Sequence, residues 1–205
     1  MQGSEKTLDI IHQLKKPLDS GIYKIKCRSF AVGMLSYTQK SSASGHYVQI
    51  LEGSGYESER EKYFLGGRYY DSILWELTKL ENGAFLMKNC DLTAGFLCYT
   101  QKKSLSGHYV QVLEGNAYNK SKDKYLPGGQ FRNSMEWEIT PSSIEGWYLI
   151  KNRDLDVGYL AWTNKSSPSG KYAQVLQGGY YPQEKDHYLP GGKWQDAVLW
   201  QFNKI

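Results

Sequence analysis

The amino-acid sequence predicts an all-β domain built from three copies of one four-stranded unit. One stretch is written three times, as SGHYVQILEG at 44–53, SGHYVQVLEG at 106–115 and SGKYAQVLQG at 169–178. The glycine that opens each unit also recurs, because Gly21 is followed 62 residues later by Gly83 and 63 residues after that by Gly146. A period of this length exceeds that of common solenoid repeats, and three copies predict a closed threefold object rather than an open array.

Length, composition and charge indicate a single folded domain. At 205 residues the chain can bury one substantial core, and its 40% hydrophobic and 22% charged residues are typical of a folded rather than a disordered protein. The 25 basic and 21 acidic side chains leave a net charge of +4, and the basic ones are scattered along the chain. We therefore expect no nucleic-acid partner.

The sequence also carries expectations about the cellular compartment. No apolar run approaches the roughly 18 residues that a membrane span requires, and the first residues lack the apolar core of a signal peptide. The three cysteines, Cys27, Cys90 and Cys98, occupy different positions in the repeats, which is typical of reduced thiols. We expect a cytoplasmic protein without a membrane span, with non-classical secretion as the alternative.

A segment without a counterpart in the later repeats precedes the first repeat. Leu8, Ile11 and Leu14 recur at helical spacing, and Pro17 ends the pattern after two lysines. The spacing predicts a short helix in an N-terminal extension of residues 1–20, packed on the domain; a membrane-surface or partner-binding helix is the alternative. The β domain is predicted over 21–205, with repeats at 21–82, 83–145 and 146–205.

Inside each repeat the hydrophobic period changes to two, which indicates strands. In the first strand of the first repeat, Tyr23, Ile25 and Cys27 alternate with lysines. The second strands carry Leu35-Tyr37, Leu97-Tyr99 and Leu160-Trp162, and the third strands carry YVQIL, YVQVL and YAQVL. The fourth strands alternate Ile73-Trp75-Leu77, Met135-Trp137-Ile139 and Val198-Trp200-Phe202, with the tryptophans predicted in the core. Almost no helical period follows Pro17, so twelve strands are predicted.

These repeats resemble a known fold. Four short strands per repeat, an opening strand of the form G-x-Y/F-x-I/M-K-N/C, an interior SG-x-Y-V turn and a tryptophan on the fourth strand are similar to a β-trefoil, specifically the ricin-B-type lectin group. The likeness covers about Gly21 to the C-terminus. The chain departs from the group twice, because Ile73, Met135 and Val198 replace the glutamine of its Gln-x-Trp signature, and because an insertion between the third and fourth strands lengthens each repeat.

The resemblance implies two or three symmetry-related, shallow sugar sites. Lectins of this group combine an aspartate from between the first two strands, an aromatic from after the third strand and a hydrogen-bonding side chain nearby, which suits the hydroxyls and the apolar face of a sugar. The aspartates are Asp91 and Asp154, where the first repeat has Ser29. The aromatics, each with a polar residue two positions later, are Tyr69 with Asp71, Phe131 with Asn133 and Trp194 with Asp196. The third unit therefore has the fullest set and the first unit the poorest.

Each of these residues also has a structural interpretation. An aspartate before a strand commonly bonds its own backbone in a turn, and an aromatic beside a double glycine packs over the loop. The repeated glutamines, Gln49, Gln111 and Gln174, are interpreted as bonding backbone, and the double glycines as tight turns with positive φ. His46 and His108 occupy symmetry-equivalent positions, so the threefold packing holds them apart. With no hydrolase, metalloprotease or phosphate-loop motif in the sequence, we expect no enzyme activity, no metal and no cofactor.

Two classes of function follow from these observations. The first is a multivalent cytoplasmic lectin whose partners are glycans or glycoconjugates. The second is a non-enzymatic protein-interaction module, such as a cytoskeletal cross-linker or an inhibitor, that contacts a protein partner through its repeated insertions. The 17 tyrosines and 6 tryptophans fit both classes, because these side chains serve as sugar platforms and as protein-binding hot spots alike.

Overall fold

The computed structural model describes residues 17–205 and confirms an all-β fold of twelve strands. The predicted N-terminal helix lies outside the described residues. Residues at alternate positions of Gly21–Cys27 and Phe85–Asn89 are buried, as the period of two predicts, whereas the third strand of each unit buries a continuous run of residues. The strands are β1 Gly21–Cys27, β2 Leu35–Ser41, β3 Gly45–Leu51, β4 Leu74–Lys79, β5 Phe85–Asn89, β6 Leu97–Lys103, β7 Gly107–Leu113, β8 Glu136–Pro141, β9 Tyr148–Asn152, β10 Leu160–Ser167, β11 Gly170–Leu176 and β12 Trp200–Lys204.

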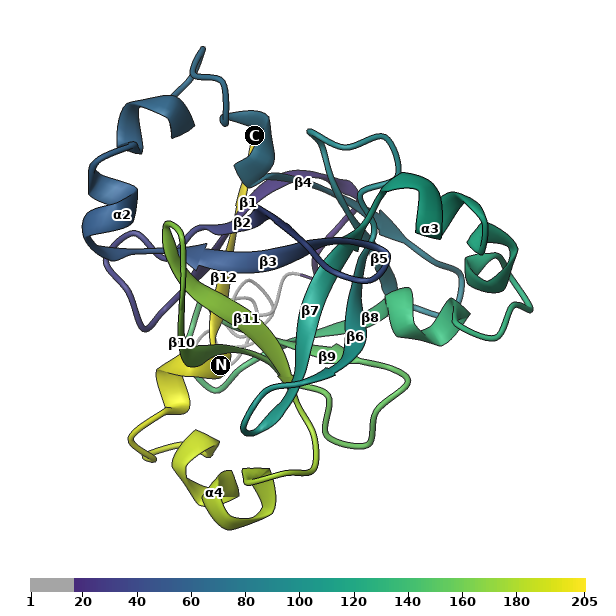
Figure 1. Ribbon diagram of the computed structural model, residues 1–205. Coiled ribbons are helices and arrows are strands. Elements are labelled where there is room, and N and C mark those ends of the chain that lie inside the picture. The colour runs from purple at the N-terminus through teal and green to yellow at the C-terminus, as the bar shows by residue number, and fades with distance from the viewer. Residues whose placement is uncertain (1–16) are drawn as a thin grey trace, which may run out of the picture.

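The strands form a barrel and a cap. The first and fourth strands of the units close an antiparallel six-stranded barrel in the order β1-β12-β9-β8-β5-β4. The second and third strands of each unit pair as hairpins, and β3, β7 and β11 pair with one another around the centre of Figure 1. Each unit therefore shares hydrogen bonds with both of the others, which is why a single unit cannot complete the fold.

The core centres on three tryptophans. Trp75, Trp137 and Trp200 are fully buried in one cluster at 0% exposure. Each indole Nε1 donates to the carbonyl of the leucine that opens its own unit's second strand, namely Leu35 (2.9 Å), Leu97 (3.0 Å) and Leu160 (3.0 Å). The predicted core position of the tryptophans is confirmed, and the hydrogen bonds connect the barrel to the cap.

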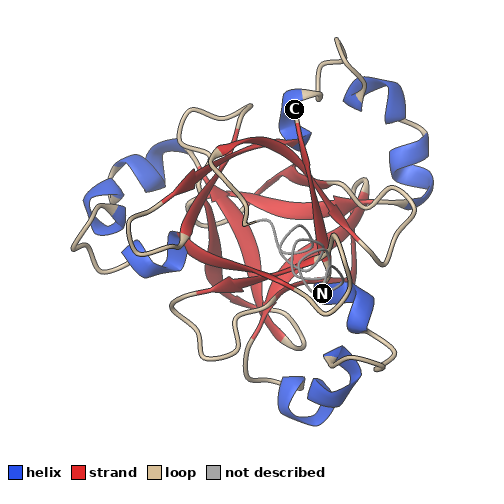
Figure 2. Cartoon of the chain, turned by 180° about the vertical axis from the view of Figure 1, so that it is seen from behind, coloured by secondary structure: helices blue, strands red, loops and turns tan. Residues whose placement is uncertain are grey.

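The insertions contain helices that the sequence analysis missed. Helices α2 Gly53–Glu57, α3 Gly115–Asn119 and α4 Tyr181–Tyr188 follow the third strands, and 3-10 turns η1 Arg60–Tyr63, η2 Asp71–Ile73, η3 Lys122–Tyr125, η4 Arg132–Met135 and η5 Gln195–Val198 accompany them. Figure 2 shows them on the outside of the barrel. The sequence shows almost no helical period after Pro17 because elements this short display no apolar stripe. None of the helices in residues 17–205 has the length and apolarity needed to cross a membrane.

The 3-10 turns also correct the start of the fourth strand. Ile73, Met135 and Val198 end η2, η4 and η5 rather than opening strands. Each is buried in a separate small cluster beneath its own insertion. The residues that replace the glutamine of the lectin signature therefore anchor the insertions to the barrel.

The double glycines are tight turns, as predicted. Gly128 has φ of +83°, where a side chain would strain the backbone. Gly129 is required for a different reason, because a Cβ there would approach the carbonyl oxygen of Lys124 to 2.4 Å. This pair folds the insertion back so that Phe131 packs against the small cluster beneath its own insertion.

Candidate functional site

Loop residues after the first strand of each unit contact the preceding unit. The aromatic side chain of one unit's second strand hydrogen-bonds the loop residue of the next unit, namely Tyr37 to Asp91 (2.6 Å), Tyr99 to Asp154 (2.5 Å) and Trp162 to Ser29 (2.9 Å). The backbone enforces this pairing through the bonds Arg28 N to Leu199 O, Cys90 N to Leu74 O and Arg153 N to Glu136 O. The predicted site residues are therefore grouped across unit boundaries.

The structure separates the three residues expected to act together in the third unit. Asp154 lies against Tyr99 of the second unit. Trp194 packs in a cluster of the third unit, and Asp196 lies 3.6 Å from Arg28 of the first unit. Sequence comparison within a unit could not reveal this, because the loop after the first strand crosses to the preceding unit.

The turns at Asp91 and Asp154 are held by neighbouring side chains. The side-chain carbonyl oxygens of Asn89 and Asn152 accept the backbone N–H groups of the two aspartates, each at 3.1 Å. The amide groups of the same asparagines reach carbonyls of the preceding unit at 2.7 Å. Both aspartate carboxylates are exposed and accept a tyrosine hydroxyl, so they retain free acceptor capacity.

The aromatics after the double glycines pack over their insertions. Tyr69 lies 5.4 Å from Tyr63 between ring centroids, and the corresponding pairs are Phe131 with Tyr125 at 5.4 Å and Trp194 with Tyr188 at 5.3 Å. All three are half-buried, whereas the polar residues Asp71 and Asn133 are exposed. The interpretation that these aromatics pack over their loops therefore holds. Trp194 and Tyr69 also line cavities.

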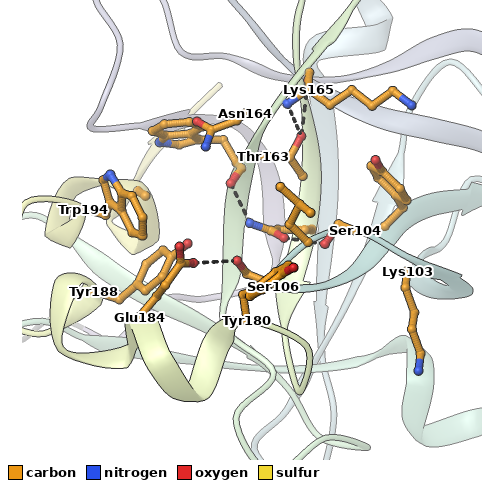
Figure 3. A pocket seen from close by; sticks show the side chains of 15 residues that line it. Lys103, Ser104, Ser106, Thr163, Asn164, Lys165, Tyr180, Glu184, Tyr188 and Trp194 are labelled. Carbon is orange, nitrogen blue, oxygen red and sulfur yellow. Dashed lines mark hydrogen bonds between the residues drawn. The ribbon is translucent and has the colours of Figure 1, made fainter.

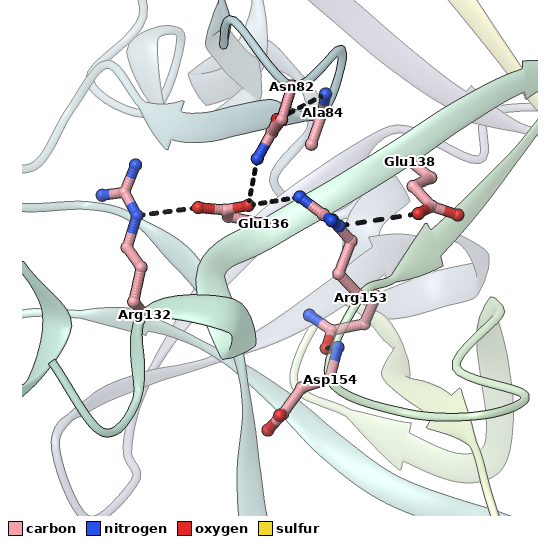
Figure 4. A network of polar contacts seen from close by, with 8 residues as sticks. Asn82, Ala84, Arg132, Glu136, Glu138, Arg153 and Asp154 are labelled. Atoms are coloured by element: carbon pink, nitrogen blue, oxygen red, sulfur yellow. Dashed lines mark hydrogen bonds and ion pairs between the residues drawn. The ribbon is translucent and has the colours of Figure 1, made fainter. Parts of the chain in front are cut away.

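A buried carboxylate breaks the symmetry beside Asp154. Glu136 is 5% exposed where the other units have leucine, and its oxygens lie 2.9 Å from both Arg132 Nε and Arg153 Nη1. Asn82 also donates to it, at 3.0 Å, and Figure 4 shows the Asp154 carboxylate pointing away from this network. Burial pushes the pKa of Glu136 upward, but the hydrogen bonds from Arg132, Asn82 and Arg153 outweigh burial and hold the pKa below its usual value.

Replacing Glu136 with glutamine should lower the free energy of unfolding by about 2 kcal/mol at pH 7, since charge-assisted hydrogen bonds are lost. A depressed pKa means that Glu136 stabilises the fold above the unfolded-state pKa of roughly 4.3 and that this contribution fades as pH falls further. Urea denaturation from pH 7 to 3 should show the two proteins converging. The control, Glu138→Gln, removes an exposed partner 3.6 Å from Arg153 and should cost under about 0.5 kcal/mol. A difference that is constant with pH contradicts this account.

An open cavity lies between the second and third units. It measures about 390 Å³, within the range of ligand pockets, and is bounded by the hairpin turn of β6–β7, by β10 and by α4. Trp162 and Trp194 contribute half-buried indole surface, and Tyr188 lies beside Trp194. Figure 3 shows Trp194 and Tyr188 together along one wall.

The polar groups of this cavity come from both units. Ser106 of the hairpin turn donates to Glu184 of α4 at 2.8 Å, and Figure 3 shows the two side chains facing each other. Asn164 adds an exposed amide that both donates and accepts. Burial raises the pKa of Tyr188 to about 12, so its hydroxyl remains protonated at neutral pH. The cavity therefore combines aromatic surface, the carboxylate of Glu184, amide and hydroxyl groups, and two lysines.

The repeated glutamines hold the hairpin turns that border this cavity and its symmetry copies. Gln174 accepts a hydrogen bond from Ser104 of the second unit at 2.5 Å and donates to the backbone of Trp162 at 2.8 Å. Gln49 forms the equivalent bonds to Ser167 and to the backbone of Tyr37. The expected bond to backbone is present for Gln49 and Gln174, whereas Gln111 donates to Cys98 Sγ. All three glutamines accept a hydrogen bond from a serine of a neighbouring hairpin turn.

A smaller copy of the cavity lies between the third and first units. It measures about 70 Å³, and Tyr37, Tyr69 and Glu59 take the places of Trp162, Trp194 and Glu184. In the second unit Ser121 stands at the glutamate position. The residues of the larger cavity that sequence reasoning missed are Glu184, Asn164, Tyr188 and Ser106; the recurrence of Glu59 and Glu184 four residues before a tyrosine was the available signal.

No protein-family model and no curated protein matches the chain. Solved structures are similar in fold. The designed threefold symmetric protein ThreeFoil is 19% identical with a TM-score of 0.54, covering 90% of this chain and 99% of that one.

Two fungal lectins are also similar. The Polyporus squamosus lectin bound to the epitope Neu5Aca2-6Galb1-4GlcNAc is 15% identical with a TM-score of 0.52, covering 92% of this chain and 50% of that one. The Macrolepiota procera ricin B-like lectin in complex with lactose is 11% identical with a TM-score of 0.50, covering 93% and 99%. The barrel, the cap and these neighbours together show that the chain has the β-trefoil fold.

Proposed function

We propose that the protein is a non-enzymatic, cytoplasmic carbohydrate-binding lectin whose main site is the cavity between the second and third units. The observation that carries this proposal is the convergence of Trp162, Trp194 and Glu184 on one open cavity. Solved structures of similar fold include lectins with bound sugars, which supports the class of ligand but assigns no residue.

Each group in the cavity has a role suited to a sugar. A pyranose has an apolar face, which stacks on indole, and hydroxyls, which need acceptors and donors at its edge. Glu184 supplies the acceptor, oriented by the hydroxyl of Ser106. Asn164 supplies both a donor and an acceptor. A ligand that crosses the boundary between units is held by two elements that are joined by the hydrogen bond from Ser106 to Glu184.

The other copies add avidity. The small cavity at Tyr37 and Tyr69 offers a second, weaker site, and the exposed carboxylates of Asp91 and Asp154, which accept the hydroxyls of Tyr37 and Tyr99, are secondary acceptors outside the main cavity. Linked weak sites on one rigid domain raise apparent affinity for multivalent glycans through effective concentration. We therefore propose a strong third-unit site with weaker symmetry mates.

A glycan array followed by calorimetry on the best ligand tests this proposal. Trp194→Ala and Glu184→Gln should each weaken binding about tenfold or more, because stacking area or a charge-assisted hydrogen bond is lost. Trp147→Ala is the matched control, because Trp147 is a half-buried indole outside the cavity. Asp154→Ala should change the main-site affinity by less than about twofold. Array binding that survives the Trp194→Ala and Glu184→Gln changes together would refute the site.

A protein-binding role for the insertions is the second candidate. Phe64, Leu126 and Leu189 occupy one position in the three insertions and are 54%, 53% and 53% exposed, and Leu65 is 84% exposed. Exposed apolar side chains repeated by symmetry are typical of a contact surface. Co-sedimentation with filamentous actin tests the cytoskeletal version; pelleting that is lost in a Phe64→Ser, Leu126→Ser, Leu189→Ser variant would favour this function over sugar binding.

A further inference from the structure

Three tyrosines meet on the threefold axis of the cap. Tyr47, Tyr109 and Tyr172 occupy one position in β3, β7 and β11, and their ring centroids are 5.8, 5.8 and 5.9 Å apart in edge-to-face contacts. The residues are 8%, 9% and 6% exposed. The rings fill the centre of the cap, where the three third strands pair around the axis in Figure 1. A side-chain group at this position of the repeat therefore occurs three times around the axis.

Three lysines surround these tyrosines. Lys40, Lys102 and Lys165 line the shallow hollow above the rings together with the tyrosines. Lys102 Nζ lies 5.7 Å from the centroid of the Tyr47 ring, and Lys40 Nζ lies 6.0 Å from that of Tyr172. Each of these two ammonium groups therefore reaches across to another unit, toward the axis rather than away from it.

The backbone at each lysine is held in place. Thr38 Oγ1 accepts the backbone N–H of Lys40 at 3.1 Å and donates to its carbonyl at 3.3 Å. Thr100 and Thr163 form the same pair of bonds with Lys102 and Lys165. The strand register shifts at the same place in all three hairpins, so the bulge that aims the lysine is a repeated feature.

The charges in this hollow have no counter-charge in the part of the chain that the structure describes. In residues 17–205 none of the three lysines forms an ion pair, and no acidic side chain lines the hollow. The three phenol hydroxyls likewise have no hydrogen-bond partner in that part of the chain. Contacts with ring faces stabilise an ammonium group but do not neutralise it. The hollow thus collects positive charge and hydrogen-bond donors.

We propose that this axial hollow binds one tetrahedral oxyanion group, a phosphate or a sulfate, per chain. Three oxygens of such a group have the same threefold symmetry as the three ammonium groups and the three hydroxyls, and each oxygen can accept from one lysine and one tyrosine. The fourth oxygen then points along the axis toward solvent. A carboxylate has two oxygens and cannot match three equivalent donors. The fourth oxygen is also where an ester substituent would leave the site, so a free ion and a terminal ester share this chemistry.

Titration calorimetry on the full chain tests the site with inorganic sulfate, inorganic phosphate and glycerol 3-phosphate, each against chloride at matched ionic strength. One anion per chain should bind. Lys102→Gln should weaken binding about tenfold, and Lys40→Gln with Lys102→Gln about a hundredfold, because each removes one charge-assisted hydrogen bond. Tyr109→Phe, which keeps the ring packing, should weaken binding several-fold.

The double variant Lys122→Gln with Lys185→Gln is the control, because it removes the same net charge from exposed lysines outside the hollow. It should leave the dissociation constant within about twofold. Binding of inorganic anions alone identifies the ligand as a free ion, and equal binding of glycerol 3-phosphate identifies it as a terminal ester group; both support the site. No saturable binding beyond chloride, or equal losses in the control, overturns the proposal. Tyr109 and Lys165 line both the hollow and the sugar cavity, whereas Lys40 and Lys102 line only the hollow. The two lysine variants therefore test the anion site independently of the lectin proposal.

Discussion

Replacing Gly107 with alanine should lower the free energy of unfolding by about 3 kcal/mol or more, measured by urea denaturation. Gly107 opens β7 and pairs with Leu176 of β11. A Cβ at this position would lie 1.8 Å from the carbonyl oxygen of Val175, and the backbone cannot move aside without breaking the pairing of the third strands. The equivalent glycines Gly45 and Gly170 are equally close to a neighbouring carbonyl, at 1.8 and 1.9 Å.

Gly115→Ala is the control for this prediction. Gly115 has φ of +81°, but nothing lies within 4 Å of its Cβ position. The cost there is that of the left-handed backbone alone, about 1 kcal/mol. Equal losses in the two variants would show that the close approach of the strands at Gly107 contributes nothing.

Trp137→Ala is expected to cost about 4 kcal/mol, because the substitution leaves a large cavity in the shared core and removes the hydrogen bond to the carbonyl of Leu97. Trp137→Phe should cost about half as much, since most of the ring volume remains. Because all three units share this core, the Trp137→Ala variant should still unfold as one domain, in a single transition, when it is denatured. Circular dichroism and tryptophan fluorescence should therefore report the same midpoint.

Trp147→Ala provides the comparison. Trp147 is a half-buried indole outside the core, and the centroid of its ring lies 5.6 Å from Arg28 Cζ. Its replacement by alanine should lower the free energy of unfolding by under about 1 kcal/mol. A second unfolding transition in the Trp137 variant would contradict a shared core and would indicate that units unfold independently.

The fold could be predicted because its determinants are local and repeated. Alternation of Tyr23, Ile25 and Cys27 has the period of a strand with one buried face, and the same pattern recurs in each unit. The insertions were misread because helices as short as α2 have too few turns to show a period. The site could be predicted only in part: Trp194 lines the main cavity, whereas Asp154 lies against Tyr99, outside that cavity.

By itself the sequence determined the threefold repetition, the strand pattern and the tryptophan core, because each depends on the spacing of residues within one unit. Only the tertiary structure decided which units meet at each site. The loop after a first strand is hydrogen-bonded to the preceding unit, as Arg28 N is to Leu199 O. Asp91 and Asp154 therefore contact side chains of the preceding unit rather than of their own. Ser106 and Glu184 are 78 positions apart and face each other for the same reason. Contacts between copies depend on how the units close around an axis, which no pattern within a copy encodes.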